Sequence, residues 1–258
     1  MSDIKSIAVT GKGGTGKTVL ATLLIRLLRE IAPGKVLAID ADSAMSLPYT
    51  LNLKVNRTVG DLRNDVMGPQ QLKRRMQSES AGDVIRELVV HGDGFDLVAM
   101  GRPEAPGCFC VVNDLLKFGI DTLAEDDYMF TVIDGEAGPE QLNRRVMNNI
   151  DLLLVVADMS VRSLQTAAGI VDVAVKNDTF GIKVKHAGLV LNRVRNDQPV
   201  QELVDKIGVE VFGYIPEDRM LNQYDRDGLS LLDLPEDSPA FVAVKEILKN
   251  ILSEQNPR

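Results

Sequence analysis

The sequence GKGGTGKT, from Gly11 to Thr18, decides the fold, because its residue types and spacing require a strand before it and a helix after it. It matches the pattern G-x-x-x-x-G-K-[ST] in full. The apolar run IKSIAV (Ile4–Val9) precedes it, and the helical pattern KTVLATLLIRLLRE follows over residues 17–30. Glycines let successive backbone N–H groups face an anion, and the start of a helix adds a partial positive charge. We therefore predict a phosphate-binding loop between a strand and a helix.

The positions of this loop divide the work of holding a nucleoside triphosphate. Lys17 is expected to bridge the β- and γ-phosphates, and the hydroxyl of Thr18 is expected to ligate Mg²⁺. The alternative is a glycine-rich turn that holds no ligand, but a full motif between a strand and a helix favours the nucleotide site. The cradle for the phosphates is expected to come from Gly11, Gly13, Gly14, Thr15 and Gly16.

Short aliphatic runs alternate with longer helical patterns along the chain. Most of these runs are almost continuously apolar, as in strands that are covered on both faces. We predict an α/β fold with one domain over residues 1–258: a single doubly wound, mainly parallel sheet of about seven or eight strands, with helices on both faces. The expected strands are Ile4–Val9, Val36–Ile39, Phe95–Met100, Phe130–Ile133, Leu152–Val156, His186–Leu191 and Val209–Tyr214, and the expected helices are 17–30, 139–149, 160–176 and 239–253. Excursions or short helices are expected over 43–94.

Charge and hydropathy exclude several classes of protein. A net charge of −8 argues against general affinity for nucleic acid, which needs a basic face. The basic run KRRMQ at 73–77 is typical of a solvated helix face. No apolar run approaches the roughly 18 to 20 residues that span a bilayer, and the first residues lack the features of a signal peptide. We expect a cytoplasmic protein with reduced thiols and with neither nucleic acid nor membrane as a partner.

Acidic residues follow two of the expected strands. Asp40 and Asp42 end the run VLAIDAD, and Asp134 ends FTVID, at the sheet edge where ligands bind in folds of this kind. Asp134 could hold Mg²⁺ through water. Glycines after it, including Gly138, would let the backbone approach a γ-phosphate and move when that group leaves.

The base of the nucleotide is predicted from a later strand. A guanine-specific site would use N-K-x-D, with its aspartate on the guanine edge. Here the strand ends LVLNRVRND, so that Asn192 and Arg193 stand there without the lysine or the aspartate two residues beyond it. Adenine, and hence ATP, is the better prediction.

The second residue of the loop, Lys12, is not needed to cradle phosphate within one chain. With it, GKGGTGKT resembles the deviant Walker A motif of the ATPase family that includes MinD, ParA and the nitrogenase iron protein. The resemblance implies that Lys12 reaches the nucleotide of a second subunit, so that ATP binding produces a homodimer. A solvent-exposed loop lysine is the alternative.

The same resemblance assigns roles to the acidic loops. Asp42 would position or activate the attacking water, and Asp40 would lie near the hydrated Mg²⁺. Ser43 stands where relatives often have proline. The segment DGEAG from Asp134 resembles the family's second switch. Asn192 together with Pro216, in GYIPEDRM, resembles its adenine pocket.

Cys108 and Cys110, in APGCFC, are the only two cysteines of the chain. Thiols one residue apart would close only a strained disulfide ring. A nucleophile would need a base, and neither His91 nor His186 has an evident link to this segment. Two thiolates are an incomplete site for a soft metal, whereas two such pairs across a twofold axis supply four. The alternative is a pair of small residues partly buried at the start of a helix.

The longer sequence GRPEAPGCFCVVNDLLK resembles the CooC-type ATPases, and the similarity extends from residue 4 to about residue 235. These proteins insert nickel into carbon monoxide dehydrogenase or serve acetyl-CoA synthase. The resemblance implies that ATP closes the dimer, that Cys108 and Cys110 of both subunits capture one Ni²⁺ or Zn²⁺, and that hydrolysis releases the metal to the client enzyme.

Two other functions fit the same motifs. A MinD- or ParA-like positioning ATPase would need a basic amphipathic tail for membrane or a basic face for DNA. We expect the tail to pack on the sheet instead, through the apolar stripe Val244, Ile247, Leu248, Ile251 and Leu252. An iron–sulfur scaffold or reductase of the nitrogenase iron-protein type would also use cysteines across a dimer, at other spacings.

Overall fold

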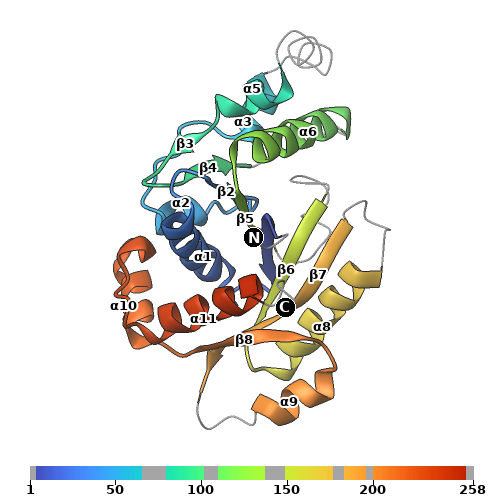
Figure 1. Ribbon diagram of the computed structural model, residues 1–258, viewed down its shortest axis with the longest axis vertical. Helices are drawn as coiled ribbons and strands as arrows, with labels where there is room; N and C mark the ends of the chain where they lie inside the picture. The colour runs from blue at the N-terminus through green and yellow to red at the C-terminus, as the bar shows by residue number, and fades with distance from the viewer. Residues whose placement is uncertain are drawn as a thin grey trace.

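The computed structural model describes residues 4–65, 80–101, 110–136, 149–176, 183–195 and 200–253. They form one eight-stranded sheet in the order β3-β4-β2-β5-β1-β6-β7-β8. Every pairing is parallel except that of β3 with β4. The predicted α/β fold with a mainly parallel sheet is therefore confirmed (Figure 1). The strands are β1 (Ser6–Gly11), β2 (Val36–Asp40), β3 (Val90–His91), β4 (Asp96–Ala99), β5 (Phe130–Asp134), β6 (Asn149–Ala157), β7 (Lys183–Val194) and β8 (Val211–Pro216).

Helices cover both faces of this sheet, as predicted. One hydrophobic cluster contains apolar residues of α1, α2, α10, η2 and α11, and a second cluster on the other face contains residues of α3, α5, α6, α8 and α9. Figure 1 shows α5 and α6 together at one end of the molecule. The helices are α1 (Lys17–Ile31), α2 (Leu47–Thr50), α3 (Val59–Asp65), α5 (Ala81–Arg86), α6 (Cys110–Asp127), α8 (Val161–Lys176), α9 (Val200–Ile207), α10 (Arg219–Asp227), η2 (Leu231–Asp233) and α11 (Pro239–Ser253).

The continuously apolar strands divide their residues between these two cores. In β1, Ile7 and Val9 belong to the cluster under α1 and α11, whereas Ala8 belongs to the opposite cluster. In β2, Leu37 and Ile39 join Ala8. Successive side chains of a strand point to opposite faces, so a strand between two helical layers needs an apolar residue at nearly every position.

The order of the strands reverses direction at β1. From β1 the chain crosses through α1 to β2 on one side, whereas β6, its other neighbour, leads through α8 to β7 on the opposite side. Ligands of doubly wound sheets bind at such a point of reversal. The phosphate loop follows β1 directly, so the fold itself brings it to that point of reversal.

The C-terminal helix packs as expected. Val244, Ile247, Leu248 and Ile251 of α11 are buried in the core, and Leu252 packs against it. Asp218, which is buried, joins this helix to the one before it: its carboxylate accepts hydrogen bonds from the backbone N–H groups of Met220 (2.8 Å) and Leu221 (3.2 Å) at the start of α10.

The same carboxylate of Asp218 accepts hydrogen bonds from the hydroxyl of Ser238 and from the backbone N–H of Ala240 (3.0 Å) at the start of α11. One side chain therefore caps two helices. Among the described residues no helix is both long and apolar enough to cross a membrane.

Several predicted boundaries were wrong. β6 begins at Asn149, which had been assigned to a helix over 139–149; residues 139–148 lie outside the described residues. The first residues of β6 include the polar Asn149 and Asp151, so the sequence did not indicate a strand there. Asp151 is nevertheless buried, because its carboxylate has hydrogen-bond and ion-pair partners. It accepts hydrogen bonds from the backbone N–H groups of Lys5 (2.8 Å) and Ser6 (2.9 Å) and pairs with Lys185 (2.6 Å).

Other elements were shifted or missed. β8 covers 211–216 rather than 209–214, and β7 is longer than the run from His186 to Leu191. The segment 43–94 contains the short helices α2, α3 and α5, as expected, and also the edge strand β3. The basic run 73–77 lies outside the described residues.

Candidate nucleotide site

The phosphate loop leaves β1 through Gly11, a position that only glycine can occupy. Gly11 has φ +143°, and a Cβ atom there would lie 2.2 Å from the carbonyl oxygen of Val156 in β6. The loop then closes on itself, since the hydroxyl of Thr15 donates to the carbonyl oxygen of Lys12 at 2.8 Å. Gly13 and Gly14 are exposed between them. The predicted strand–loop–helix arrangement is present.

Asn192 locks the far side of the loop. Its side-chain amide donates to the carbonyl oxygen of Thr15 at 2.7 Å, and the residue is only 4% exposed. Gly16 has φ +98°, and a Cβ there would lie 2.2 Å from Nδ2 of Asn192. The glycine thus allows β7 to approach the loop, and it takes the left-handed conformation that glycine adopts readily.

Arg193 joins this contact through an irregularity of the sheet. The pairing of β7 with β8 shifts between Leu191 and Val194, and Arg193 has φ +56°, which is unusual for a residue other than glycine. Its guanidinium donates to the carbonyl oxygen of Gly14 at 3.1 Å. Bulges of this kind re-aim side chains. Asn192 and Arg193, which we predicted at the base, both contact the phosphate loop; their role at adenine stays a prediction, as does that of Pro216, which ends β8 beside Val194.

Buried carboxylates lie beside the start of α1. The hydroxyl of Thr18 donates to Oδ2 of Asp134 at 2.7 Å, and Asp134 is fully buried. Its other oxygen, Oδ1, is buried and has no hydrogen-bond partner within the described residues. Asp40, paired with Asp134 across β2 and β5, accepts hydrogen bonds from the backbone N–H groups of Asp42 (3.0 Å) and Leu47 (3.1 Å).

Burial makes both carboxylates resist ionisation. It raises the pKa of Asp40 to about 7, with a further contribution from the charge of Asp134. Burial also raises the pKa of Asp134 to about 6, against the opposing effects of the Thr18 hydroxyl and the charge of Lys17. A divalent cation would relieve this penalty, because it favours the ionised form.

The donor set fits Mg²⁺. An orphaned carboxylate oxygen, a second carboxylate and a hydroxyl are hard oxygen ligands, and Mg²⁺ is usually held by one or two carboxylates together with phosphate oxygens and water. Within the described part of the chain, no group of three or more His, Cys, Asp or Glu residues could hold a metal alone.

Asp42 lies in the loop after β2. Its Oδ1 accepts a hydrogen bond from the backbone N–H of Ala44 at 2.8 Å, and its own carbonyl oxygen accepts one from Met45 at 3.0 Å. The carboxylate is partly exposed. Gly138, predicted at the γ-phosphate, lies outside the described residues.

Two residues that we had not singled out complete this edge. Glu136, two residues after Asp134, bonds to Ser43 in the loop of Asp42 and, through its carbonyl oxygen, to Thr10. Thr10 is fully buried directly before the phosphate loop. The sequence DGEAG contains Glu136, but nothing in its spacing indicates a partner more than ninety residues away.

Lys12 is exposed at the rim of the site. Asp158, just after β6, lies close enough to respond to it. Burial alone would raise the pKa of Asp158, but hydrogen bonds from Ser160 and the charges of Lys12 and Arg193 lower it below its ordinary value. Among the described residues, Lys12 and Arg193 therefore lie near enough to Asp158 for their charges to act on it.

The predicted metal-binding pair lies at the boundary of the described residues. Cys110 is the first residue of α6, whereas Cys108 and the side chain of Cys110 lie outside them. β4, α6 and β5 form a crossover between parallel strands, so α6 starts near the carboxyl edge of the sheet. The phosphate loop lies at that same edge.

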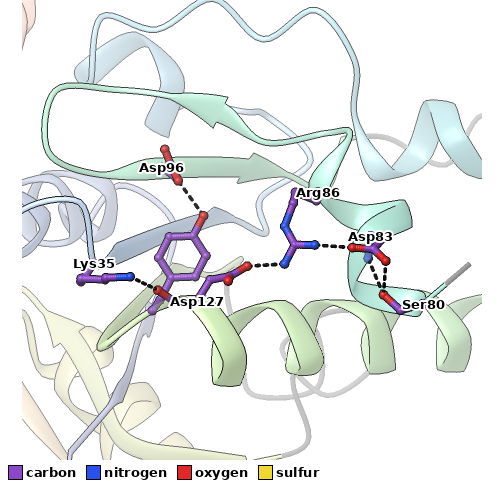
Figure 2. Close-up of polar contacts among 7 residues, drawn as sticks. Lys35, Ser80, Asp83, Arg86, Asp96 and Asp127 are labelled. Carbon is purple, nitrogen blue, oxygen red and sulfur yellow. Dashed lines mark hydrogen bonds and ion pairs between the residues drawn. The ribbon is translucent and has the colours of Figure 1, made fainter.

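The opposite end of α6 is fixed by polar contacts. Arg86 of α5 forms ion pairs with Asp83 and with Asp127, the last residue of α6 (Figure 2). Lys35 donates to the carbonyl oxygen of Asp127 at 3.2 Å. The hydroxyl of Tyr128, the next residue, donates to Asp96 of β4 at 2.6 Å. The helix that begins with Cys110 is thus anchored to both its neighbouring helix and the sheet.

A family model and several known proteins match most of the length of this chain. The CobQ/CobB/MinD/ParA nucleotide-binding domain matches residues 6–231. An uncharacterized ATP-binding protein of Methanocaldococcus jannaschii is 38% identical, covering 96% of this chain and 99% of its own. The carbon monoxide dehydrogenase accessory protein CooC of Rhodospirillum rubrum is 31% identical, covering 91% of this chain and 90% of its own.

Solved structures agree on the fold. The MinD protein in the MinC:MinD cell division complex of Aquifex aeolicus superposes with a TM-score of 0.71 at 21% identity, over 98% of each chain. A ParA-family ATPase of Chlorobium tepidum gives 0.68 at 18% identity, over 96% of this chain and 99% of its own. The chain belongs to the CobQ/CobB/MinD/ParA family of nucleotide-binding proteins. It is an ATPase of that family, as predicted from the phosphate loop.

Proposed function

We propose that this ATPase is a CooC-type metallochaperone, which carries Ni²⁺ or Zn²⁺ as cargo between two subunits and delivers nickel to a client enzyme. One observation carries the proposal: a Cys-x-Cys pair, whose second member Cys110 is the first residue of α6, stands in a chain 31% identical to a carbon monoxide dehydrogenase accessory protein. In the proposal, nucleotide binding and metal binding are coupled because the same dimer completes both sites.

In this proposal the nucleotide site works as follows. Lys17 and the loop backbone hold the phosphates of ATP, while Thr18, Asp134 and Asp40 hold Mg²⁺ directly or through water. Bound Mg²⁺ would neutralise charge on the phosphate oxygens. Asp42 orients the attacking water by accepting a hydrogen bond from it. Its carboxylate already accepts a hydrogen bond from the N–H of Ala44 in the same loop.

The dimer completes both sites. Lys12 lies exposed at the rim, where it can reach a nucleotide on a second subunit. Cys108 and Cys110 of each subunit then supply four thiolates, the number that a tetrahedral zinc site uses. The second switch, with Gly138, would respond to loss of the γ-phosphate and loosen the dimer.

The client and the compartment follow from the same proposal. The client would be a nickel enzyme, carbon monoxide dehydrogenase or acetyl-CoA synthase, in the cytoplasm. A membrane-positioning ATPase is disfavoured, because α11 buries Val244, Ile247 and Leu248 in the core and cannot present them to lipid.

The experiment is a titration of the purified protein with Ni²⁺, with and without ATP, while light scattering follows the mass. We expect one Ni²⁺ per two chains and a dimer that depends on ATP. Cys108→Ser with Cys110→Ser should lose the metal and keep ATP-dependent dimerisation. Lys17→Ala is the matched control: it should lose nucleotide binding and with it the dimer.

Three outcomes would contradict the proposal. Stoichiometric nickel binding by the double cysteine variant would place the metal elsewhere. One metal per single chain would remove the need for a dimer. An absorbance near 400 nm in anaerobically purified protein would favour an iron–sulfur scaffold instead.

A further inference from the structure

The two loops that follow β2 and β5 are joined through one carboxylate. Oε1 of Glu136 accepts a hydrogen bond from the backbone N–H of Ser43 at 3.1 Å and another from its hydroxyl at 2.5 Å. Hydrogen bonds to an ionised carboxylate are shorter and stronger than neutral ones. Both donors of a single residue therefore converge on one carboxylate oxygen.

Hydrogen bonds join the backbone at Glu136 to β1. The hydroxyl of Thr10 donates to its carbonyl oxygen at 2.8 Å, and the backbone N–H of Gly135 donates to the carbonyl oxygen of Val9 at 2.9 Å. Thr10 is the last residue before the phosphate loop and is fully buried. The backbone of Glu136 thus moves with β1, and its side chain reaches across to the loop after β2.

Ser43 is the neighbour of Asp42. The loop that carries both residues is attached at its start, where the N–H of Asp42 donates to Asp40 at 3.0 Å, and at its end, where the N–H of Leu47 donates to the same carboxylate at 3.1 Å. Between these points, the two hydrogen bonds to Glu136 tie the loop to the phosphate-loop strand. A shift of Ser43 would carry Asp42 with it.

We propose that Glu136 is a positioning residue for ATP hydrolysis. By holding Ser43 close to Thr10, directly before the phosphate loop, it fixes Asp42 at the nucleotide site. The inference rests on the proposed role of Asp42. Glu136 acts through Ser43 and does not itself take up the proton of water. A small misplacement of a water-orienting group slows the chemical step more than it weakens binding of the nucleotide.

The test compares Glu136→Ala, Glu136→Gln and Ser43→Ala in steady-state ATP hydrolysis and in equilibrium ATP binding. Glu136→Ala removes both hydrogen bonds from Ser43. It should lower kcat at least about tenfold and leave the Kd for ATP within about threefold. Glu136→Gln keeps an acceptor oxygen and should restore most of the rate. Ser46→Ala is the matched control, since Ser46 lies in the same loop and its side chain does not cap α2.

A double-mutant cycle separates this route from a general loss of structure. If the residues act through their mutual contact, Glu136→Ala should lower kcat less in a Ser43→Ala background than in the wild type. Fully additive losses would overturn the inference, as would a Glu136→Ala variant with normal kcat. A Glu136→Gln variant as slow as Glu136→Ala would show that an acceptor oxygen for Ser43 does not restore the rate and would also overturn the inference.

Asp42→Asn distinguishes the failure of the inference from the failure of the proposed mechanism. Normal turnover by Asp42→Asn would remove the role of Asp42 and with it this route. Slow turnover by Asp42→Asn together with normal turnover by Glu136→Ala would overturn the positioning role alone.

Discussion

The side-chain amide of Asn192 lies 2.7 Å from the carbonyl oxygen of Thr15, so that a residue of β7 fixes a phosphate loop 177 positions earlier in the chain. Gly16, between the two, leaves just enough room for this contact. The conformation of the loop therefore depends on the sheet as a whole and not only on its own glycines.

Replacing this amide should weaken nucleotide binding. Asn192→Ala removes the donor to Thr15 and also the acceptor of the backbone N–H of Arg193. Because the loop must then be ordered by the ligand, we expect the Kd for ATP to rise about fivefold to tenfold, equivalent to one lost hydrogen bond. Equilibrium titration with a fluorescent ATP analogue would measure it. Asn222→Ala, at an exposed position of α10, is the control and should bind normally.

Asp134→Asn should stabilise the nucleotide-free protein while abolishing its function. Burial raises the pKa of Asp134 from 3.8 to about 6, so the unfolded state holds fewer protons than the folded state in this range. The free energy of unfolding contributed by this group therefore falls as pH rises from about 4 to 6 and stays low above. At pH 8 the amide should gain about 1 to 3 kcal/mol, measured by urea unfolding.

Two comparisons sharpen this result. The variant should lose the stabilisation that Mg·ATP gives to the wild type, because the carboxylate proposed to hold Mg²⁺ is gone. Asp151→Asn should have the opposite sign, since the contacts with Lys5, Ser6 and Lys185 lower the pKa of Asp151 despite its burial. A loss of stability in Asp134→Asn at pH 8 would show that the carboxylate is needed for folding.

Asp42→Asn should separate binding from hydrolysis. The amide oxygen can still accept the hydrogen bond from Ala44, so the loop and ATP affinity should be kept. Loss of the carboxylate should lower kcat about a hundredfold, the size of a general-base contribution. The dimer should then persist in ATP, as followed by light scattering. Adding Lys12→Ala should return it to the monomer; a dimer in the double variant would argue against contact of Lys12 with a second subunit.

Asp218→Asn should destabilise the C-terminal part of the chain. One oxygen can still cap α10, but the amide group would face two donors, the hydroxyl of Ser238 and the N–H of Ala240. We expect a loss of about 1 to 3 kcal/mol in the free energy of unfolding, from thermal or urea denaturation. Asp227→Asn, exposed in α10, should change it little.

The same residue predicts a pH dependence. Burial would raise the pKa of Asp218, but hydrogen bonds from Ser238, Ala240, Leu221 and Met220 lower it below 3.8. Its contribution to stability is therefore complete above pH 4 and is lost as pH falls toward the lower pKa of the folded state. Below pH 4 the wild type should lose stability more steeply than Asp218→Asn. Parallel curves would indicate that this carboxylate is not the group that titrates.

The parts of the molecule that sequence predicted are those set by local patterns. Gly11 to Thr18, Asp40 and Asp134 stand beside their strands in sequence, and parallel strands bring these ends together whatever the length of chain between them. The continuously apolar runs predicted strands covered on both faces, and the two hydrophobic clusters lie on those faces. The apolar stripe of α11 could be predicted because its spacing fits one face of a helix, and the structure confirms that this face packs in the core.

What could not be predicted depends on register between distant segments. The contact of Ser43 with Glu136 spans 93 positions, and that of Asn192 with Thr15 spans 177. No periodicity shows which side chains will face each other at that separation. An acidic residue directly before a helix is a typical N-cap, so the contact of Asp218 with α10 could have been predicted. Its hydrogen bond to the start of α11 could not, because it depends on the path of the loop between the two helices.

This shared cap has a consequence for the dynamics of the chain. Because Asp218 closes the first turns of both α10 and α11, neither helix can fray from its beginning without releasing the other. Amide hydrogens at Met220, Leu221 and Ala240 should therefore exchange with solvent in a single cooperative opening, with one common free energy.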